Sequence, residues 1–366
     1  MAALAATAAL AGLVAAGWAL WVDRASEPPP PAAIPAPPAP PPPSLVSEPG
    51  LPLRGVPLTS PTGLRLLVAD APAPYVLDVD SGETTPITGL PTGGERVVSL
   101  VRVGEDALVA SYRICTECRS GPVMHYLLRN GSPAAIPFAR AFTAVGSRDG
   151  AGAWLFTSRR PRGCMIREVD LSGRDRRPPL LASCNTGLVA ELPGGLLLNY
   201  AGPGGVEAYT VLVRRNGGEV RYEDWQAQPL VGNLVLSGID RLSGLTVHDM
   251  ARRTNRRLSW PAPRGFGVGD VIGEPHGTRA IVEFARYAPR HRLDVWVLDT
   301  QTRRWTHLPD MPAAIVPKET SIQWTPDGRV VILDGPALGV WRPGDAHIGI
   351  RRVKPSRQPG SSFLVW

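Results

Sequence analysis

Short apolar runs separated by turn residues recur from about residue 60 to the end of the chain. They are rich in Val, Leu and Ile, as in LRLLVA at 64–69, VVSLVRV at 97–103 and RVVILD at 329–334. Runs of this length, bounded by Gly, Pro, Asn or Asp, predict β-strands. After residue 25 the sequence shows no long amphipathic helical pattern. The pattern therefore predicts an all-β protein.

A pair of strands joined by a tight turn is the most visible unit, and it occurs seven times. The turns read DSGE at 80–83, NGSP at 130–133, LSGR at 171–174, NGGE at 216–219, RRTN at 252–255, DTQT at 299–302 and PGDA at 343–346. Successive turns are separated by a mean of about 44 residues, which is the period of a four-stranded propeller blade. We therefore predict a β-propeller of seven blades over residues 61–366, with six blades as the open alternative.

The first unit is one strand short. It offers strands at 64–69, 75–80 and 85–89, with no innermost strand ahead of them. At the other end, SSFLVW at 361–366 remains after the seventh unit is complete. We expect these last residues to supply the missing inner strand, because such closure leaves no open seam in the ring.

The segment WTPDG at 324–328, followed by RVVIL, resembles a turn of known propellers. In TolB-type and WD-repeat-like propellers this turn joins the first two strands of a blade. The motif residues in this chain are Trp324, Pro326, Asp327 and Gly328. The resemblance is confined to one unit, and it implies a binding or scaffold role with no catalytic residues carried over.

The N-terminal residues indicate a membrane tether. Residues 1–22 contain no charged side chain, and about 20 apolar residues are enough to cross a bilayer. Residues 1–24 are predicted to be a retained transmembrane signal anchor, with a cleaved signal peptide as the open alternative. Residues 25–60 include PPPPAAIPAPPAPPPP at 28–43, which predicts a polyproline II spacer. The propeller would then lie on the extracytoplasmic side of the cell membrane.

Four cysteines fit such an oxidising compartment. Cys164 and Cys184 are equidistant from position 174, beside the Gly173 turn, and residues opposite each other in a hairpin are close enough for a disulfide. Cys115 and Cys118 could close a tight loop in CTEC or pair across to the neighbouring blade. A four-thiolate zinc site and a redox-active CxxC are the open alternatives.

The sequence offers few groups suited to catalysis. No two of the six histidines have metal-ligand spacing, and there is no nucleophile elbow or phosphate-binding glycine loop. Glu283, Asp294 and Asp299 would form a glycosidase-like carboxylate group only if the fold brought them together. The sequence therefore predicts no catalytic residue, no metal ligand and no cofactor.

Arginines are the more informative charged residues in a chain of net charge +7. They cluster in or just after the hairpin turns, so they would line one rim of the disc. The clustered residues are Arg174, Arg176, Arg177, Arg252, Arg253, Arg256, Arg257, Arg303 and Arg304. Such charge could protect exposed edge strands from pairing, or it could face lipid headgroups or an acidic envelope polymer.

These observations predict a membrane-tethered binding or sensor module whose partner is a protein or an envelope polymer. Nucleic acid is not expected, because the predicted compartment is wrong and no motif alternates aromatic and basic residues. The alternative is a propeller-fold hydrolase or lyase acting on cell-envelope glycans. Clustered and perturbed carboxylates near the ring axis would favour that alternative.

Overall fold

A computed structural model describes most of the chain beyond residue 52. The described residues are 53–69, 74–91, 95–113, 121–158, 163–201, 208–222, 227–237, 244–286, 292–314, 320–353 and 362–366. The predicted anchor, most of the predicted spacer, Cys115 and Cys118 lie outside them. Within these ranges, no helix is long and apolar enough to cross a membrane.

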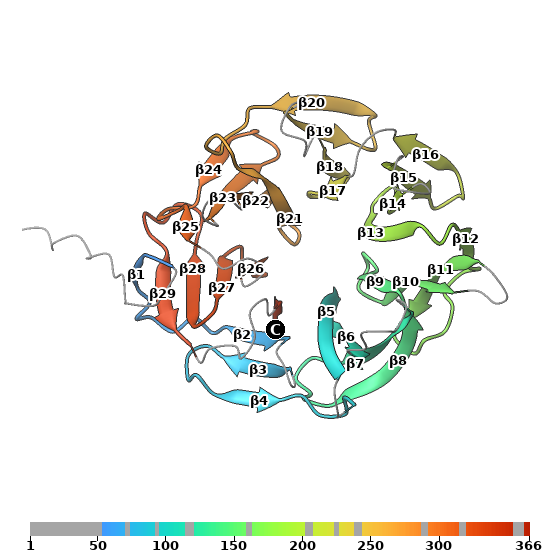
Figure 1. Cartoon of the computed structure of the whole chain (residues 1–366), viewed down its shortest axis with the longest axis horizontal. Helices are drawn as coiled ribbons and strands as arrows, with labels where there is room; N and C mark the ends of the chain where they lie inside the picture. The colour runs from blue at the N-terminus through green and yellow to red at the C-terminus, as the bar shows by residue number, and fades with distance from the viewer. Residues whose placement is uncertain are drawn as a thin grey trace, which may run out of the picture. The chain divides into compact units, whose positions relative to one another are not determined.

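Seven sheets are arranged as the blades of a β-propeller, which confirms the predicted fold and blade number (Figure 1). From its innermost to its outermost strand, the first blade consists of β30 (Phe363–Val365), β2 (Arg65–Val68), β3 (Tyr75–Asp78) and β4 (Thr84–Pro86). In the same order, the second consists of β5 (Glu95–Val103), β6 (Asp106–Arg113), β7 (Val123–Leu128) and β8 (Ala135–Ala141). The third consists of β9 (Thr143–Gly146), β10 (Gly152–Ser158), β11 (Cys164–Asp170) and β12 (Leu180–Ala182).

The remaining blades follow the same order around the ring. The fourth consists of β13 (Thr186–Leu192), β14 (Gly195–Ala201), β15 (Ala208–Arg214) and β16 (Glu219–Tyr222). The fifth consists of β17 (Gln228–Pro229), β18 (Leu234–Ser237), β19 (Leu245–Asp249) and β20 (Thr254–Leu258). The sixth consists of β21 (Gly267–Gly273), β22 (Arg279–Arg286), β23 (Arg292–Asp299) and β24 (Trp305–His307), with β25 (Ala313–Ala314) also paired to β23. The seventh consists of β26 (Thr320–Trp324), β27 (Val330–Asp334), β28 (Ala337–Trp341), β29 (Gly349–Arg352) and β1 (Val56–Pro57).

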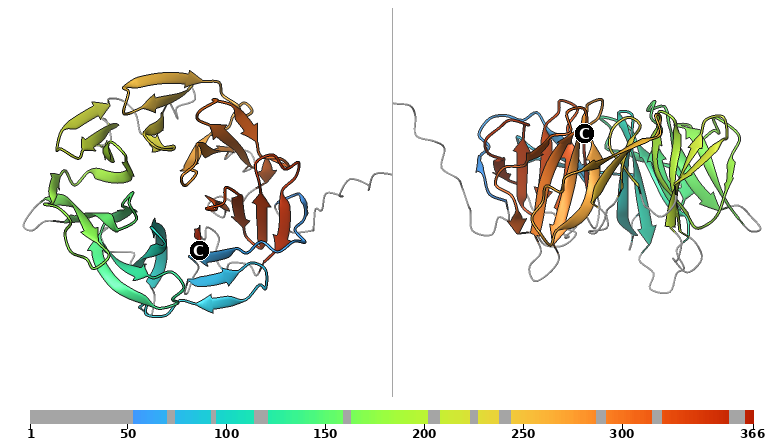
Figure 2. Two further views of the ribbon diagram at one scale, coloured as in Figure 1. Left: turned by 180° about the vertical axis from the view of Figure 1, so that it is seen from behind. Right: turned by 90° about the horizontal axis from the view of Figure 1, so that it is seen from above.

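In blades two to seven, two turns lie on one face of the ring, which we call the hairpin face: the turn between the first and second strands, and the turn between the third and fourth. Blade one has only the second of these turns, because its first strand is the C-terminal β30. Strands that run up and down require this arrangement. In the second blade, Asp106 beside the first of these turns accepts hydrogen bonds from Arg129 Nη1 at 2.7 Å and from the Asn130 amide at 2.9 Å, both in the other. Figure 2 shows the ring from behind and from its side.

The core lies between the blades. In the described part of the chain, buried side chains form seven clusters, one at each junction between neighbouring blades. Successive residues of a central strand point to opposite neighbours: Ile281 packs toward blade seven and Val282 toward blade five. Both faces of such strands are buried, which explains why their apolar runs show little alternation with polar residues.

The ring closes at the junction of its last and first blades. β30 pairs with β2, as in Leu66 with Val365, so the C-terminal residues form the innermost strand of blade one. β1 runs parallel to β29 on the outer edge of blade seven. Residues 53–60, which the proline-rich composition places in the spacer, therefore pack against the propeller.

Arg351 stabilises this junction by hydrogen bonds. Its guanidinium donates to the carbonyl oxygens of Leu58 at 3.1 Å and Ser60 at 3.2 Å, and to Asp80 Oδ1 at 2.8 Å. Although burial raises the pKa of Asp80, hydrogen bonds from the Thr62 and Gly63 amides, the Thr62 hydroxyl and Arg351 lower it to about 2. The chain thus reaches blade one on the hairpin face.

Candidate functional site

The predicted basic rim divides into two parts that differ in charge balance. In blade three the arginines are paired: Arg176 contacts Asp149 at 2.6 Å and Glu168 at 2.9 Å, and Arg177 contacts the same Glu168. The hydrogen bond from Arg176 holds the pKa of Asp149 well below its usual range. Arg174 is exposed in the adjacent turn. This part of the rim is largely neutralised.

Blades five and six carry the unbalanced part. All six of their rim arginines are exposed: Arg252, Arg253, Arg256, Arg257, Arg303 and Arg304. With partners in the described ranges, these six arginines form one ion pair, between Arg252 and Asp249 at 3.6 Å. The hairpin turns of these two neighbouring blades therefore concentrate positive charge.

Two of these arginines occupy a strained backbone conformation. Arg253 has φ 57° and Arg303 has φ 60°, in the left-handed region that costs a non-glycine residue about 1–2 kcal/mol. In the corresponding turns of the other five blades, the residue with positive φ is a glycine. Those glycines are Gly82, Gly131, Gly173, Gly217 and Gly344.

The turns of blades one, five and six share one design. Each begins with an aspartate whose Oδ1 accepts backbone amides within the turn, and the fourth residue after it has positive φ. The aspartates are Asp78, Asp249 and Asp299. Blade one has glycine at the strained position, whereas blades five and six have arginine. Strain that the fold could relieve with glycine is characteristic of functional positions.

A cleft lies between these two turns. It has a volume of about 680 Å³, and its lining includes Arg252, Arg256, Arg303 and one carboxylate, Asp249. Three arginines against one aspartate give this lining a formal charge of +2. The Asp249 carboxylate is already engaged by the amides of its own turn, at 3.0 Å each. The cleft is therefore suited to an anion, since arginine forks match carboxylate and phosphate oxygens.

Apolar side chains also line the cleft, at the level of the turn and below it. Leu298 is fully buried, and Leu234, Val247 and Leu258 are partly buried against the cluster between blades five and six. Thr300 and Gln301 add polar groups on the blade six side. The arginines and polar groups of the cleft lie at the turns, and Leu258 and Leu298 below them are apolar.

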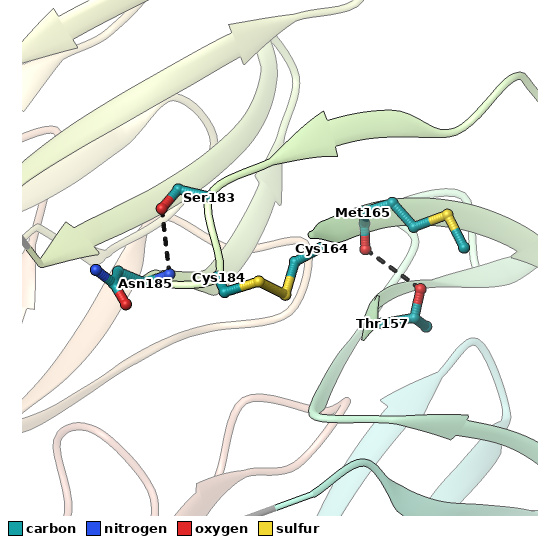
Figure 3. Close-up of a disulfide and its surroundings, with 6 residues drawn as sticks. All are labelled: Thr157, Cys164, Met165, Ser183, Cys184 and Asn185. Atoms are coloured by element: carbon teal, nitrogen blue, oxygen red, sulfur yellow. Dashed lines mark hydrogen bonds between the residues drawn. A yellow bond between two sulfur atoms is a disulfide. The ribbon is translucent and has the colours of Figure 1, made fainter. Parts of the chain in front are cut away.

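Cys164 and Cys184 form a disulfide that links the third strand of blade three to the residues after its fourth strand (Figure 3). Cys164 and Cys184 have a Cα–Cα distance of 5.1 Å. They are not directly opposite, because Cys164 pairs with Ala182 and Cys184 lies beyond the end of β12. The bond uses two of the four thiolates that the zinc alternative required, so that alternative is wrong.

The WTPDG segment is the turn between the first two strands of blade seven. Trp324 is buried and donates from Nε1 to the Ile272 carbonyl of blade six at 2.9 Å. Gly328 has φ 77°, and its amide donates to the Thr325 carbonyl at 3.0 Å. Pro326 and Asp327 are exposed at the tip of the turn. Trp324 of this motif therefore links blade seven to blade six.

The three carboxylates considered from sequence do not come together. Asp294 pairs with Phe284 and faces blade five, whereas Glu283 pairs with Val295 and faces blade seven. Asp299 is on the same face as Glu283 but four residue pairs away, at the hairpin turn. Asp294 is buried and accepts a hydrogen bond from Trp296 Nε1 at 2.9 Å, and its Oδ1 lies 2.6 Å from His307 Nε2.

Glu283 has a different neighbour that the sequence did not suggest. A bulge between Val268 and Val271 in β21 places Gly269 against its side chain. Burial, and secondarily the negative charge of Asp270, raise the pKa of Glu283 to about 8. Asp270 itself is exposed on this innermost strand. One perturbed carboxylate therefore lies behind the inner surface of the ring.

No protein-family model matches the chain, and no curated protein matches it in sequence. Solved structures similar to it include TolB and other β-propeller proteins. The periplasmic gluconolactonase of Pseudomonas aeruginosa is 13% identical with a TM-score of 0.52, covering 82% of this chain and 99% of its own. Prolyl oligopeptidase B of Galerina marginata is 11% identical with a TM-score of 0.54, covering 80% of this chain and 48% of its own. TolB of Acinetobacter baumannii is 11% identical with a TM-score of 0.47, covering 83% and 67%. At these identities the likeness is one of fold.

The sequence predicts the rim arginines but not the cleft that three of them line. Leu234, Val247 and Leu258 are distant from Arg303 in sequence and share the cleft with it only because blades five and six are neighbours. One signal was present in the sequence: the fourth residue after the turn aspartate is glycine in blade one, at Gly82, and arginine in blades five and six, at Arg253 and Arg303.

Proposed function

We propose that this protein is a membrane-tethered, extracytoplasmic propeller that binds an anionic ligand in the cleft between blades five and six. The observation that carries the proposal is the strained Arg303 in the lining of the cleft, where the same turn in blade one has glycine. Retaining this strain makes physical sense if the Arg303 side chain contributes to binding. The formal charge of the lining favours an anion over a neutral ligand.

The tether and the compartment are parts of the same proposal. The uncharged run over residues 1–22 supports an anchor, and the Cys164–Cys184 disulfide is suited to an oxidising compartment. The chain reaches blade one on the hairpin face, on which the turns that flank the cleft also lie. Among propellers, the WTPDG turn favours the TolB-type group.

Titration calorimetry of the full-length protein with pyrophosphate tests the binding role. Arg256→Gln should weaken binding by about tenfold, the loss of roughly one charge-assisted hydrogen bond. Arg257→Gln is the matched control, because Arg257 is the next residue of β20 and lies on its opposite face, toward blade four. An equal loss in both variants would show that the rim attracts anions without a site, and no binding by the wild type would refute the proposal.

A hydrolase or lyase is the second candidate, favoured by the raised pKa of Glu283 beside Asp270. A carboxyl group that remains protonated near neutral pH is suited to general acid catalysis. The test is hydrolysis of lactones and envelope glycans by the wild type and by Glu283→Gln. Turnover that is lost in this variant and retained in Arg256→Gln would support an enzyme, and absence of turnover in the wild type would count against it.

A further inference from the structure

We infer that the ligand of the cleft between blades five and six is an amphipathic anion, with a phosphate or carboxylate next to a small apolar group. This inference rests on the proposed function and specifies the chemistry of the ligand. It is drawn from the order in which polar, cationic and apolar side chains follow one another down the cleft.

Blade five presents this order along two paired strands. Thr254 pairs with Asp249 at the turn, Arg256 pairs with Val247 one step below, and Leu258 lies one step below Arg256. Each step of two residues along a strand covers about 6.8 Å. All five side chains lie on the face of the sheet that lines the cleft. An anion held by Arg256 would therefore have Val247 beside it and Leu258 one step below it.

Blade six presents the same order from the other side. Arg303, Thr300 and Gln301 are at its turn, and Leu298 lies below them and is fully buried. Phe284 and Trp305 make an edge-on ring contact in the cluster beneath. The lower cleft is therefore bounded on both sides by side chains that favour an apolar group.

The size of the cleft supports a ligand larger than a simple ion. About 680 Å³ falls within the range of pockets that hold small organic molecules. An inorganic anion at the arginines would leave Val247 and Leu258 facing water. Filling the lower cleft would remove that apolar surface from water and add to the affinity. The shared chemistry suits either a free amphiphile or the headgroup region of an anionic lipid.

Comparison of hexyl phosphate with inorganic phosphate tests the inference. Calorimetry would use the full-length protein in phosphatidylcholine nanodiscs. The wild type should bind hexyl phosphate at least about tenfold more tightly, a difference of about 1.4 kcal/mol. Val247→Thr, which keeps the side-chain shape, and Leu258→Gln should each reduce this ratio to below about threefold. Thr246→Val is the control, since Thr246 faces away from the cleft.

The outcomes separate this inference from the proposed function. Equal affinities of the wild type for the two phosphates would overturn the amphipathic ligand while leaving the anion site intact. Failure of both phosphates to bind would overturn the site itself. Nanodiscs that contain phosphatidic acid distinguish the sources: weaker apparent binding of hexyl phosphate identifies a lipid headgroup as the ligand, and unchanged binding identifies a free amphiphile.

Discussion

Replacing Arg303 with glycine is expected to stabilise the propeller and, at the same time, weaken its binding of anions. Arg303 has φ 60°, and its amide donates to the Asp299 carbonyl at 2.7 Å, so the turn needs this conformation. Relief of left-handed strain contributes about 1–2 kcal/mol. The greater freedom of glycine in the unfolded chain offsets about 0.4–1 kcal/mol of this.

The net expectation for Arg303→Gly is a stability gain of about 0.5–1 kcal/mol, a rise of about 1–3 °C in Tm. Scanning calorimetry measures the stability, and titration with pyrophosphate measures the binding. Arg253→Gly is the matched control, because it relieves the same strain in blade five but Arg253 is not part of the cleft lining. It should stabilise equally and leave binding nearly unchanged.

The converse change completes the test. Gly82 has φ 71° in the same type of turn, and a Cβ there would meet nothing within 4 Å. Gly82→Arg should therefore destabilise the fold by about 0.5–1 kcal/mol through strain alone. If Arg303→Gly were destabilising, or if both arginine variants lost binding equally, the reasoning from strain to function would fail.

Three further predictions concern stability. The pKa of Glu283 is raised in the folded state to about 8, so its contribution to stability is complete below its unfolded value and is lost as pH rises through about 8. The free energy of unfolding measured in urea should thus decline between pH 5 and 8, as expected for one titrating group. Glu283→Gln should abolish this decline. Replacing both Cys164 and Cys184 with serine should lower the free energy of unfolding by about 3 kcal/mol, and reduction of the wild type should have the same effect. Arg351→Ala should lower the free energy of unfolding by about 2–3 kcal/mol, because it removes hydrogen bonds to Leu58, Ser60 and Asp80. An unchanged unfolding midpoint would show that residues 53–60 add nothing to ring closure.

The fold could be predicted because its signals are local. Hairpin turns with Gly, Asp or Asn mark each blade, and their spacing gives the number of blades. Strands such as β17, with two residues, and β1, on the outer edge of blade seven, carry no comparable signal. They are defined by hydrogen bonds to neighbouring strands, which short sequences do not specify.

The site was less predictable, because it depends on which face of a strand each residue occupies. Glu283 and Asp294 look equally available in the sequence, but the register of β22 and β23 directs them to opposite blades. In the same way, the register of β19 and β20 brings Arg256 next to Val247, nine positions away in the chain. Turn symmetry about position 174 also misplaced Cys184, because the paired residues centre on Gly173 instead.

The most direct test of the binding site is to locate an anion in a crystal of the protein. Arsenate mimics phosphate and scatters X-rays anomalously, so its position can be determined independently of the protein density. We predict an anomalous peak within hydrogen-bonding distance of Arg256 and Arg303. A peak only at Arg257 and Arg304, or one beside Asp270 near the ring axis, would contradict a ligand site between blades five and six.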